Sequence, residues 1–258
     1  NISVYANTDP ERTTLIIKGS VIPVQRSVAP AYGHTMGTLG LKAVHVPFFE
    51  VYTNKTKVEK IDIINNGKTP LTLEFDKVPR HLDVSVLPET LSPGQKGRIL
   101  ITYHADRAKD WGIRRDEFWV KLPSSDKPQP QNKITVSADI QEDYSGMTPD
   151  QIAKAPHLEI GNDLVDFGTI KGNAAASKSV SLTNTGVSNL QIRKVNNESQ
   201  VVSVSLPQMS IQSGKSIDMK ITVLPSKSRS RLLNHRIFII TNDPARPTIS
   251  LPVVATFE

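Results

Sequence analysis

The chain has 258 residues, which is enough for about two domains. Its apolar residues (38%) form no run near the ~18 that a membrane-spanning helix needs, and a net charge of +6 is weak support for a polyanionic partner. The absence of cysteine excludes disulfide scaffolds, zinc–thiolate sites and thiol nucleophiles from this segment.

A repeated phrase divides the chain. The stretch NTDPERTTLIIKG near the N-terminus returns in related form as TNDPARPTISLPV near the C-terminus. Three aspartates in polar turns, Asp9, Asp126 and Asp243, are spaced by 117 residues. The glycines of the turns NNG and NTG, Gly67 and Gly186, are 119 residues apart. Several markers in constant order indicate tandem domains with a period of about 115–120 residues.

The repeat predicts the order of the domains. Only the tail of the unit precedes the first complete copy, so we expect the final hairpin of an upstream domain whose beginning is missing. A connector rich in Gly, Ala and Pro follows and is expected to be loose. The predicted order is hairpin, connector, first complete domain, linker and second complete domain, over residues 1–23, 24–43, 44–143, 144–156 and 157–258.

Each complete domain consists of short alternating runs. In KVEKIDIIN and GRILITYHA, apolar residues such as Ile61, Ile63 and Ile99 alternate with polar ones, which is typical of half-buried antiparallel strands. About seven such runs per domain predict an all-β fold of tandem immunoglobulin-like β-sandwiches. The Cys–Trp–Cys core of antibody domains is absent.

Glycines mark the predicted turns. We expect Gly67 and Gly186 to adopt positive φ in tight hairpins, and Gly94 to be left-handed after Pro93. The polar segment 123–133 is expected to form an exposed hairpin loop.

The stretch MTPDQIAKA predicts a short helix between the complete domains. Thr148 is a candidate N-cap, Pro149 suits the first helical position, and Gln151 lies three residues after the cap, as in a capping box. We expect one or two helical turns over residues 149–155. Such a joint fixes the angle between domains better than a Gly/Ser linker does.

Four stretches carry a family resemblance: TNDPARPTISLPV, IQEDYSGMTPDQIAKAP, VDFGTIKG and KDWGIRRDEF. Over essentially its whole length the chain resembles a family of uncharacterised Bacteroidetes proteins made of tandem immunoglobulin-like domains, a domain of unknown function. That family is related to Hydin-type (ASH) and major-sperm-protein-like sandwiches. The resemblance implies the fold and an exported, periplasmic or cell-surface protein whose signal sequence is not in this segment, and it implies no established activity.

The chain departs from that family in two places. The stretches 76–84 and 194–202 match the position of the family's Ser-Cys-Gly-Cys-Thr motif but contain no cysteine, so no role of that motif carries over. The usual Phe-Gly-x-Ile entry survives at residues 167–170. It reads FFEV at residues 48–51, where we expect an altered local turn.

The residues that could perform chemistry are few. The six histidines include no pair at ligand spacing, so we predict no metal site and no cofactor. There is no Gly-x-Ser-x-Gly elbow, and SGK at residues 213–215 lacks the first glycine of a phosphate loop. Adjacent carboxylates such as Asp116 and Glu117 point to opposite faces of a strand. We therefore expect no catalytic residue.

Two basic loops are the candidate binding sites. They lie in ADRAKDWGIRR and, 120 residues later, in PSKSRSRLLNHR, which places both at the same end of their sandwiches. Either the loops bind an anionic partner, or their arginines are simply solvated. The candidate binding residues are Arg107, Lys109, Trp111, Arg114, Arg115, Lys227, Arg229, Arg231 and Arg236.

Aromatic residues add a smaller signal. Trp111 is expected to be partly exposed, and of Phe118 and Trp119 one faces the core and the other faces outward. The outward ring either anchors a partner or covers a domain joint. No aromatic residues interleave with the basic ones as nucleic-acid binding requires, so we expect no nucleic-acid partner.

The leading functional hypothesis is a non-enzymatic scaffold or binding module whose partner is an envelope protein or an anionic glycan. The first alternative is a chaperone-like protein that binds a client by strand addition, which requires a basic anchor between the domains and a free apolar edge strand. The second alternative is an enzyme, which requires His, Asp or Glu side chains that converge in a deep pocket.

Overall fold

The structure is a computed structural model and describes residues 2–5, 9, 12–15, 31–122 and 129–258. Near the N-terminus, the antiparallel strands β1 (Ile2–Tyr5) and β2 (Arg12–Leu15) form a hairpin within the predicted 1–23 segment. The assignment of this hairpin to an upstream domain stays a prediction. The first part of the predicted connector, up to residue 30, lies outside the described residues.

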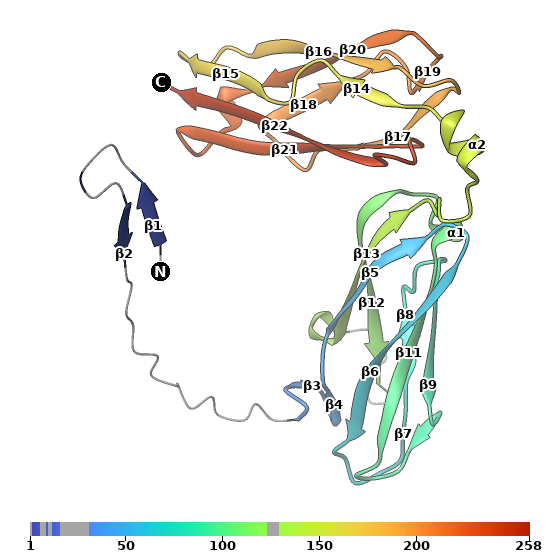
Figure 1. The fold of residues 1–258 in the computed structure, drawn as a ribbon. Coiled ribbons are helices and arrows are strands. Elements are labelled where there is room, and N and C mark those ends of the chain that lie inside the picture. The colour runs from blue at the N-terminus through green and yellow to red at the C-terminus, as the bar shows by residue number, and fades with distance from the viewer. Residues whose placement is uncertain (1, 6–8, 10–11, 16–30, 123–128) are drawn as a thin grey trace.

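The first sandwich is built from eleven strands and two short helical turns (Figure 1). They are β3 (His34–Met36), β4 (Leu39–Leu41), β5 (His45–Tyr52), β6 (Thr56–Asn65), β7 (Leu71–Thr72), β8 (Glu74–Asp76), β9 (Leu82–Leu87), β10 (Thr90–Leu91), β11 (Lys96–His104), α1 (Ala105–Ala108), β12 (Gly112–Lys121), the 3-10 turn Pro130–Asn132 and β13 (Lys133–Gln141). The two main sheets have the strand orders β3-β4-β6-β11-β9 and β5-β13-β12-β8, and β7 pairs with β10. Strand β5 runs parallel to β13.

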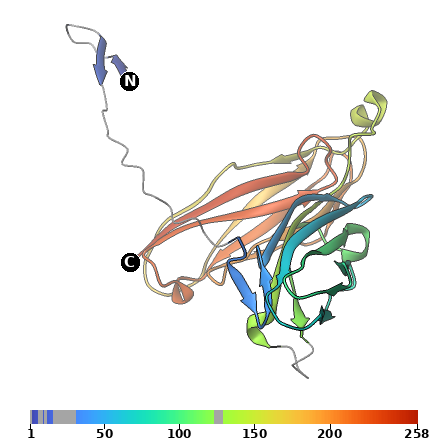
Figure 2. The ribbon, with the colours of Figure 1, turned by 90° about the horizontal axis from the view of Figure 1, so that it is seen from below.

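The second sandwich repeats this plan. Its elements are β14 (Leu158–Ile160), β15 (Val165–Ile170), β16 (Ala176–Asn184), β17 (Leu190–Asn196), β18 (Val202–Ser205), β19 (Ser210–Ile211), β20 (Ser216–Val223), the 3-10 turn η2 (Pro225–Lys227), β21 (Leu232–Thr241) and β22 (Thr248–Phe257). The strand orders are β14-β16-β20-β18 and β15-β22-β21-β17-β19, and β15 runs parallel to β22. The two sandwiches cross at a steep angle (Figures 1 and 2). The predicted all-β, immunoglobulin-like fold is confirmed.

Each sandwich has its own hydrophobic core. Along β11 the buried residues Ile99, Ile101 and Tyr103 alternate with half-buried ones, as the sequence pattern predicts. In the first core the rings of Phe48 and Tyr103 lie 5.3 Å apart between centroids. The described residues of the two core clusters do not overlap. Full burial of one such aliphatic side chain contributes roughly 1.5–3 kcal/mol, so each sandwich is stabilised mainly from within.

The end of the predicted connector is part of the first sandwich. Residues 34–41, which we expected to be loose, form the β3–β4 hairpin, and β4 pairs with β6. The glycines around this hairpin suggested a linker, but Met36, Leu39 and Leu41 are all buried in the first core. The remaining division into domains stays a prediction.

The two Asn-Gly turns differ from the prediction. Neither Gly67 nor Gly186 has positive φ, and the second turn carries the chain from one sheet to the other, so that it closes no tight hairpin. These glycines are needed because the backbone is crowded. A Cβ on Gly186 would lie 2.4 Å from the carbonyl oxygen of Ala155, and one on Gly67 would lie 3.1 Å from the Cβ of Thr38. Gly94 does take the predicted left-handed conformation, with φ 74°.

The linker helix has the predicted cap. Helix α2 (Pro149–Ala153) begins at a capping box in which Gln151 N–H donates to Thr148 Oγ1 at 3.3 Å and Thr148 N–H donates to Gln151 Oε1 at 2.8 Å. The helix ends two residues earlier than predicted. The Ser188 hydroxyl and the Val187 N–H donate to the carbonyls of Lys154 and Ala155, and so fasten the linker to the second sandwich.

The predicted loop 123–133 is described only at its end, because residues 123–128 lie outside the described residues. Asn132, which we expected to be exposed, is buried, and its side-chain amide donates to the Val120 carbonyl at 3.3 Å. This hydrogen bond satisfies the carbonyl and anchors the start of β13.

Candidate functional site

The two basic loops occupy equivalent positions but different surroundings. Each follows the long strand β11 or β20 and precedes β12 or β21. The first loop, with α1, lies at the joint between the sandwiches, whereas the second lies at the end opposite α2 (Figure 1). The second loop lies beside the C-terminus, since the Arg231 carbonyl accepts a hydrogen bond from the Phe257 N–H. The predicted residues therefore do not form one surface.

Two of the four cations of the first loop, Arg107 and Arg114, are neutralised by acids of their own domain. The Arg107 guanidinium lies 3.5 Å from the Asp83 carboxylate. Arg114 donates to both oxygens of Asp116 and, at 3.2 Å, to Asp110. Lys109 and Arg115 are exposed, and no ion pair joins them to another described residue. Arg114 is therefore a structural residue rather than a free binding group.

A chain of polar groups runs from the first core to this loop. The ring of His81, which is buried, donates from Nε2 to the buried Asp116 carboxylate at 2.8 Å, and Arg114 binds that carboxylate from the other side. Burial alone would raise the pKa of the Asp116 carboxyl, but the hydrogen bonds from His81 and Arg114 outweigh it and hold the pKa below its usual value. Asp116 is thus a charged anchor for both partners.

Asp110 extends this series of polar contacts into the second sandwich. Its carboxylate accepts a hydrogen bond from Lys194 Nζ of β17 at 2.8 Å, besides those from Arg114 and the Trp111 backbone. Partial burial works against ionisation, yet the bonds from Lys194 and Trp111 lower the pKa of Asp110. The two sandwiches are therefore joined by an ion pair that is only partly exposed to solvent.

Arg193 forms a second bond across the joint. Its guanidinium pairs with Glu142 at 2.7 Å and lies 5.5 Å from the centroid of the Trp111 ring, which is half-buried. Trp111 therefore covers the joint. Phe118 faces the first core, and Trp119 lies half-buried with the Lys77 ammonium 5.1 Å from its centroid.

Close packing completes the joint. Gly112 has φ 71°, and a Cβ built on it would lie 2.3 Å from Cδ1 of Ile240. Ile240 belongs to β21 of the second sandwich and is buried outside the second core cluster, because the first sandwich covers it. A larger residue at position 112 would push the sandwiches apart.

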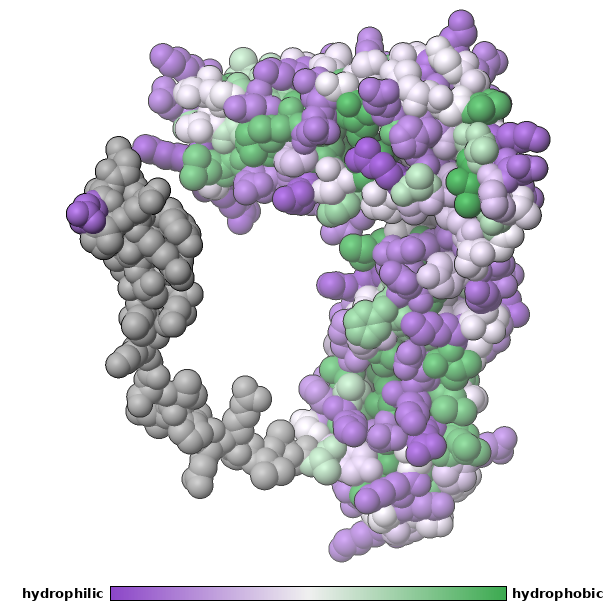
Figure 3. Space-filling view, in the orientation of Figure 1, coloured by the Kyte–Doolittle hydropathy of each residue, from purple (hydrophilic) through white to green (hydrophobic). Residues whose placement is uncertain are grey.

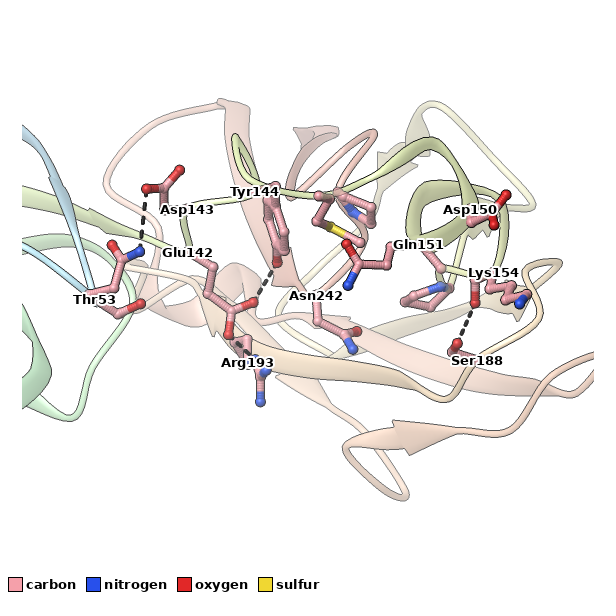
Figure 4. Close-up of a pocket in the computed structure, with 15 residues that line it drawn as sticks. Thr53, Glu142, Asp143, Tyr144, Asp150, Gln151, Lys154, Ser188, Arg193 and Asn242 are labelled. Carbon is pink, nitrogen blue, oxygen red and sulfur yellow. Dashed lines mark hydrogen bonds and ion pairs between the residues drawn. The ribbon is translucent and has the colours of Figure 1, made fainter.

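A cleft of about 690 Å³ opens beside the linker at this joint (Figure 4). The polar side chains that line it bind one another: the Tyr144 hydroxyl donates to Glu142, and the Asn54 amide donates to Asp143 at 3.3 Å. Lys55, outside the lining, pairs with Asp143 at 2.6 Å. The Lys55 ammonium and the hydrogen bonds from Ser145 hold the pKa of Asp143 well below its usual range. Most of these groups serve the joint.

The second basic loop presents free cations. Lys227, Arg229 and Arg231 are exposed, and no ion pair joins them to another described residue. Hydrophilic side chains project from this end of the molecule (Figure 3). Arg236 lies further along β21 and donates to Ser250 Oγ at 3.1 Å, while burial lowers the pKa of the adjacent His235.

Sequence reasoning missed Glu142, Arg193 and Lys194. Nothing in a single sequence distinguishes them from solvated charges, because their partners lie in another domain. Among the described residues, no group of three or more His, Asp or Glu side chains is placed to hold a metal ion. The helices of the described part are too short and polar to cross a membrane.

Comparison with known families matches residues 156–256, nearly all of the second sandwich, to the HYDIN/CFA65/VesB-like, Ig-like domain family. The predicted Hydin-type resemblance is thereby confirmed. A search of curated protein sequences finds no match.

One solved structure in particular is similar to this chain in fold. A protein of unknown function from Porphyromonas gingivalis W83 is 18% identical with a TM-score of 0.61, over 85% of this chain and 100% of that one. The ASH/PapD-like domain 7 of human CEP192 scores 0.31 at 11% identity, over 51% of this chain and 99% of that one. The CsuC–CsuE chaperone–adhesin complex of Acinetobacter baumannii scores 0.31 at 13% identity, over 86% and 100%. The last two scores are too low to bear on function. The Ig-like fold itself is compatible with a binding or scaffold role.

Proposed function

We propose that this chain is a non-enzymatic scaffold and binding module of the bacterial cell envelope, which holds two sandwiches at a fixed mutual angle. The joint carries this proposal. The Asp110–Lys194 and Arg193–Glu142 ion pairs and the Gly112–Ile240 contact connect the domains independently of the linker helix. A joint fastened at several separate points resists bending, so surfaces on the two domains keep a constant spacing.

The site chemistry also favours binding over catalysis. A catalytic group must reach substrate with a proton or a lone pair that is free to react. In the cleft, Glu142, Asp143, Tyr144 and Arg193 are hydrogen-bonded or ion-paired to one another or to neighbours. A periplasmic or cell-surface location accords with the Bacteroidetes resemblance and forms part of the proposal.

The chaperone-like alternative has less support. Strand addition by such a protein needs a free basic anchor between the domains, but Arg193 and Lys194 are both paired with acids there. It also needs a free apolar edge, whereas the edge strands β9 and β18 carry exposed polar residues such as Asp83, Ser85 and Ser203 between their valines.

Rigidity can be measured directly because the chain has no cysteine. Spin labels at Lys68→Cys and Lys220→Cys, both exposed, report the distance between the domains by double electron–electron resonance. We expect one narrow distance distribution, which Lys194→Glu broadens at least about two-fold by repelling Asp110. Lys215→Glu makes the same charge change at an exposed site and should not broaden it. A broad distribution in the unaltered joint contradicts the proposal.

The same variants test the function in pull-downs from the native envelope. A partner that the unaltered chain retains and Lys194→Glu releases, with Lys215→Glu unaffected, supports a scaffold that depends on the domain angle. A turnover assignable to this segment would instead show that it is an enzyme.

A further inference from the structure

The loop between β20 and β21 forms a basic tip, which we define as Lys227, Arg229, Arg231 and the exposed Leu232. Residues 225–236 contain no Asp or Glu. The loop holds its own shape: Ser228 Oγ donates to the Ser230 carbonyl at 2.8 Å, and Leu232 N–H donates to Ser230 Oγ at 3.1 Å. The cations therefore stand on an ordered loop that contains no acidic residue of its own.

The equivalent loop of the first sandwich provides an internal comparison. There, Asp110 and Asp116 are interleaved with the cations and neutralise Arg114. That loop contacts a neighbouring sandwich through an ion pair and an apolar contact, Asp110 with Lys194 and Gly112 with Ile240. The basic tip has the same place in the repeat but contains no acidic residue, and no described residue covers it.

We propose that the basic tip binds an acidic face or segment of a partner protein. Guanidinium groups of Arg229 and Arg231 suit carboxylates, which they can bind through two parallel hydrogen bonds. Leu232 is 69% exposed beside these cations. An apolar residue within a charged patch suits a protein surface, which offers apolar side chains together with carboxylates, better than it suits an anionic glycan. The proposal rests on the binding role above and assigns its partner class.

The test uses the whole chain and two fluorescent probes, a short peptide of glutamates with interspersed leucines and dextran sulfate. Binding is followed by anisotropy at low and at raised salt. Combined Lys227→Ser, Arg229→Ser and Arg231→Ser substitutions should weaken peptide binding about ten-fold or more. The matched control removes the same charge at Lys68, Arg80 and Lys96, which are exposed and unpaired. This control should change the peptide affinity less than about two-fold. Leu232→Ser should weaken binding of the peptide but not of dextran sulfate.

Three results overturn the proposal: no peptide binding, equal losses in both triple variants, or binding of dextran sulfate alone. The last would identify the tip as a site for anionic polymers, and equal losses would reveal unspecific attraction. Lys194→Glu should leave peptide binding unchanged, because the tip lies away from the joint. A failure of the rigid joint is therefore distinguishable from a failure of the basic tip.

Discussion

Phe49 holds a backbone conformation that favours glycine. Its φ is 53°, and its side chain is 71% exposed, whereas Gly168 has φ 63° at the matching position of the second sandwich. Both residues lie in a register shift between two parallel strands. The expected alteration of the turn is therefore wrong: the first domain keeps the turn and accepts a strained residue in it. Lys57 helps to hold it, because its ammonium donates to the Phe48 and Glu50 carbonyls.

We predict that Phe49→Gly stabilises the first sandwich. Relief of a left-handed conformation is worth about 1–2 kcal/mol, from which the extra backbone entropy of glycine removes about 0.5–1 kcal/mol. Tryptophan fluorescence during urea unfolding follows this domain and its joint with the second sandwich, because Trp111 and Trp119 both belong to the first domain and Trp111 covers the joint. The converse change, Gly168→Ala, should destabilise the second sandwich in circular dichroism. A loss of stability in Phe49→Gly would mean that the exposed ring contributes packing.

At the level of elements, one asparagine organises each Asn-x-Gly turn. Asn65 is fully buried, and its amide donates to the carbonyls of Thr69 at 2.8 Å and Leu91 at 2.9 Å while its oxygen accepts from Gly67. Asn184 makes the equivalent three bonds in the second sandwich. The asparagine side chain therefore explains why the turn recurs in the sequence. It links strands that a tight hairpin alone would not join.

Asn65→Ala should destabilise the first sandwich by about 2–3 kcal/mol, because it leaves buried carbonyls and an N–H without partners. The neighbouring Asn66 is exposed, and Asn66→Ala should cost less than about 0.5 kcal/mol. Tryptophan-detected urea unfolding compares the two. Equal effects would show that the side-chain bonds of Asn65 are not what holds the turn.

The elements were largely predictable because they depend on local patterns. Alternation in β11 and the capping box at Thr148 are encoded within a few residues and are confirmed. The β3–β4 hairpin was missed because Met36, Leu39 and Leu41 are apolar among glycines, and only their contact with a distant core shows that they form strands. The joint was missed for the same reason: the partner of Asp110 is Lys194, which lies 84 residues away in the sequence.

At the scale of the molecule, acids at the joint make its rigidity dependent on pH. Asp110 and Asp116 have pKa values below their usual ones in the folded protein. A lowered folded-state pKa contributes stability that is present above the unfolded value, near 3.9, and is lost as pH falls through the folded value. The joint should therefore be intact from pH 8 to about pH 5 and should weaken below about pH 4.

We expect the spin-label distance distribution between positions 68 and 220 to stay narrow down to about pH 5 and to broaden below about pH 4, as Asp110 takes up a proton and releases Lys194. Asp110→Asn removes the titrating group, so this variant should be broader at neutral pH and should change less on acidification. Far-UV circular dichroism at each pH separates loosening of the joint from unfolding of the sandwiches. Broadening between pH 5 and 7 would mean that a group other than Asp110 controls the joint.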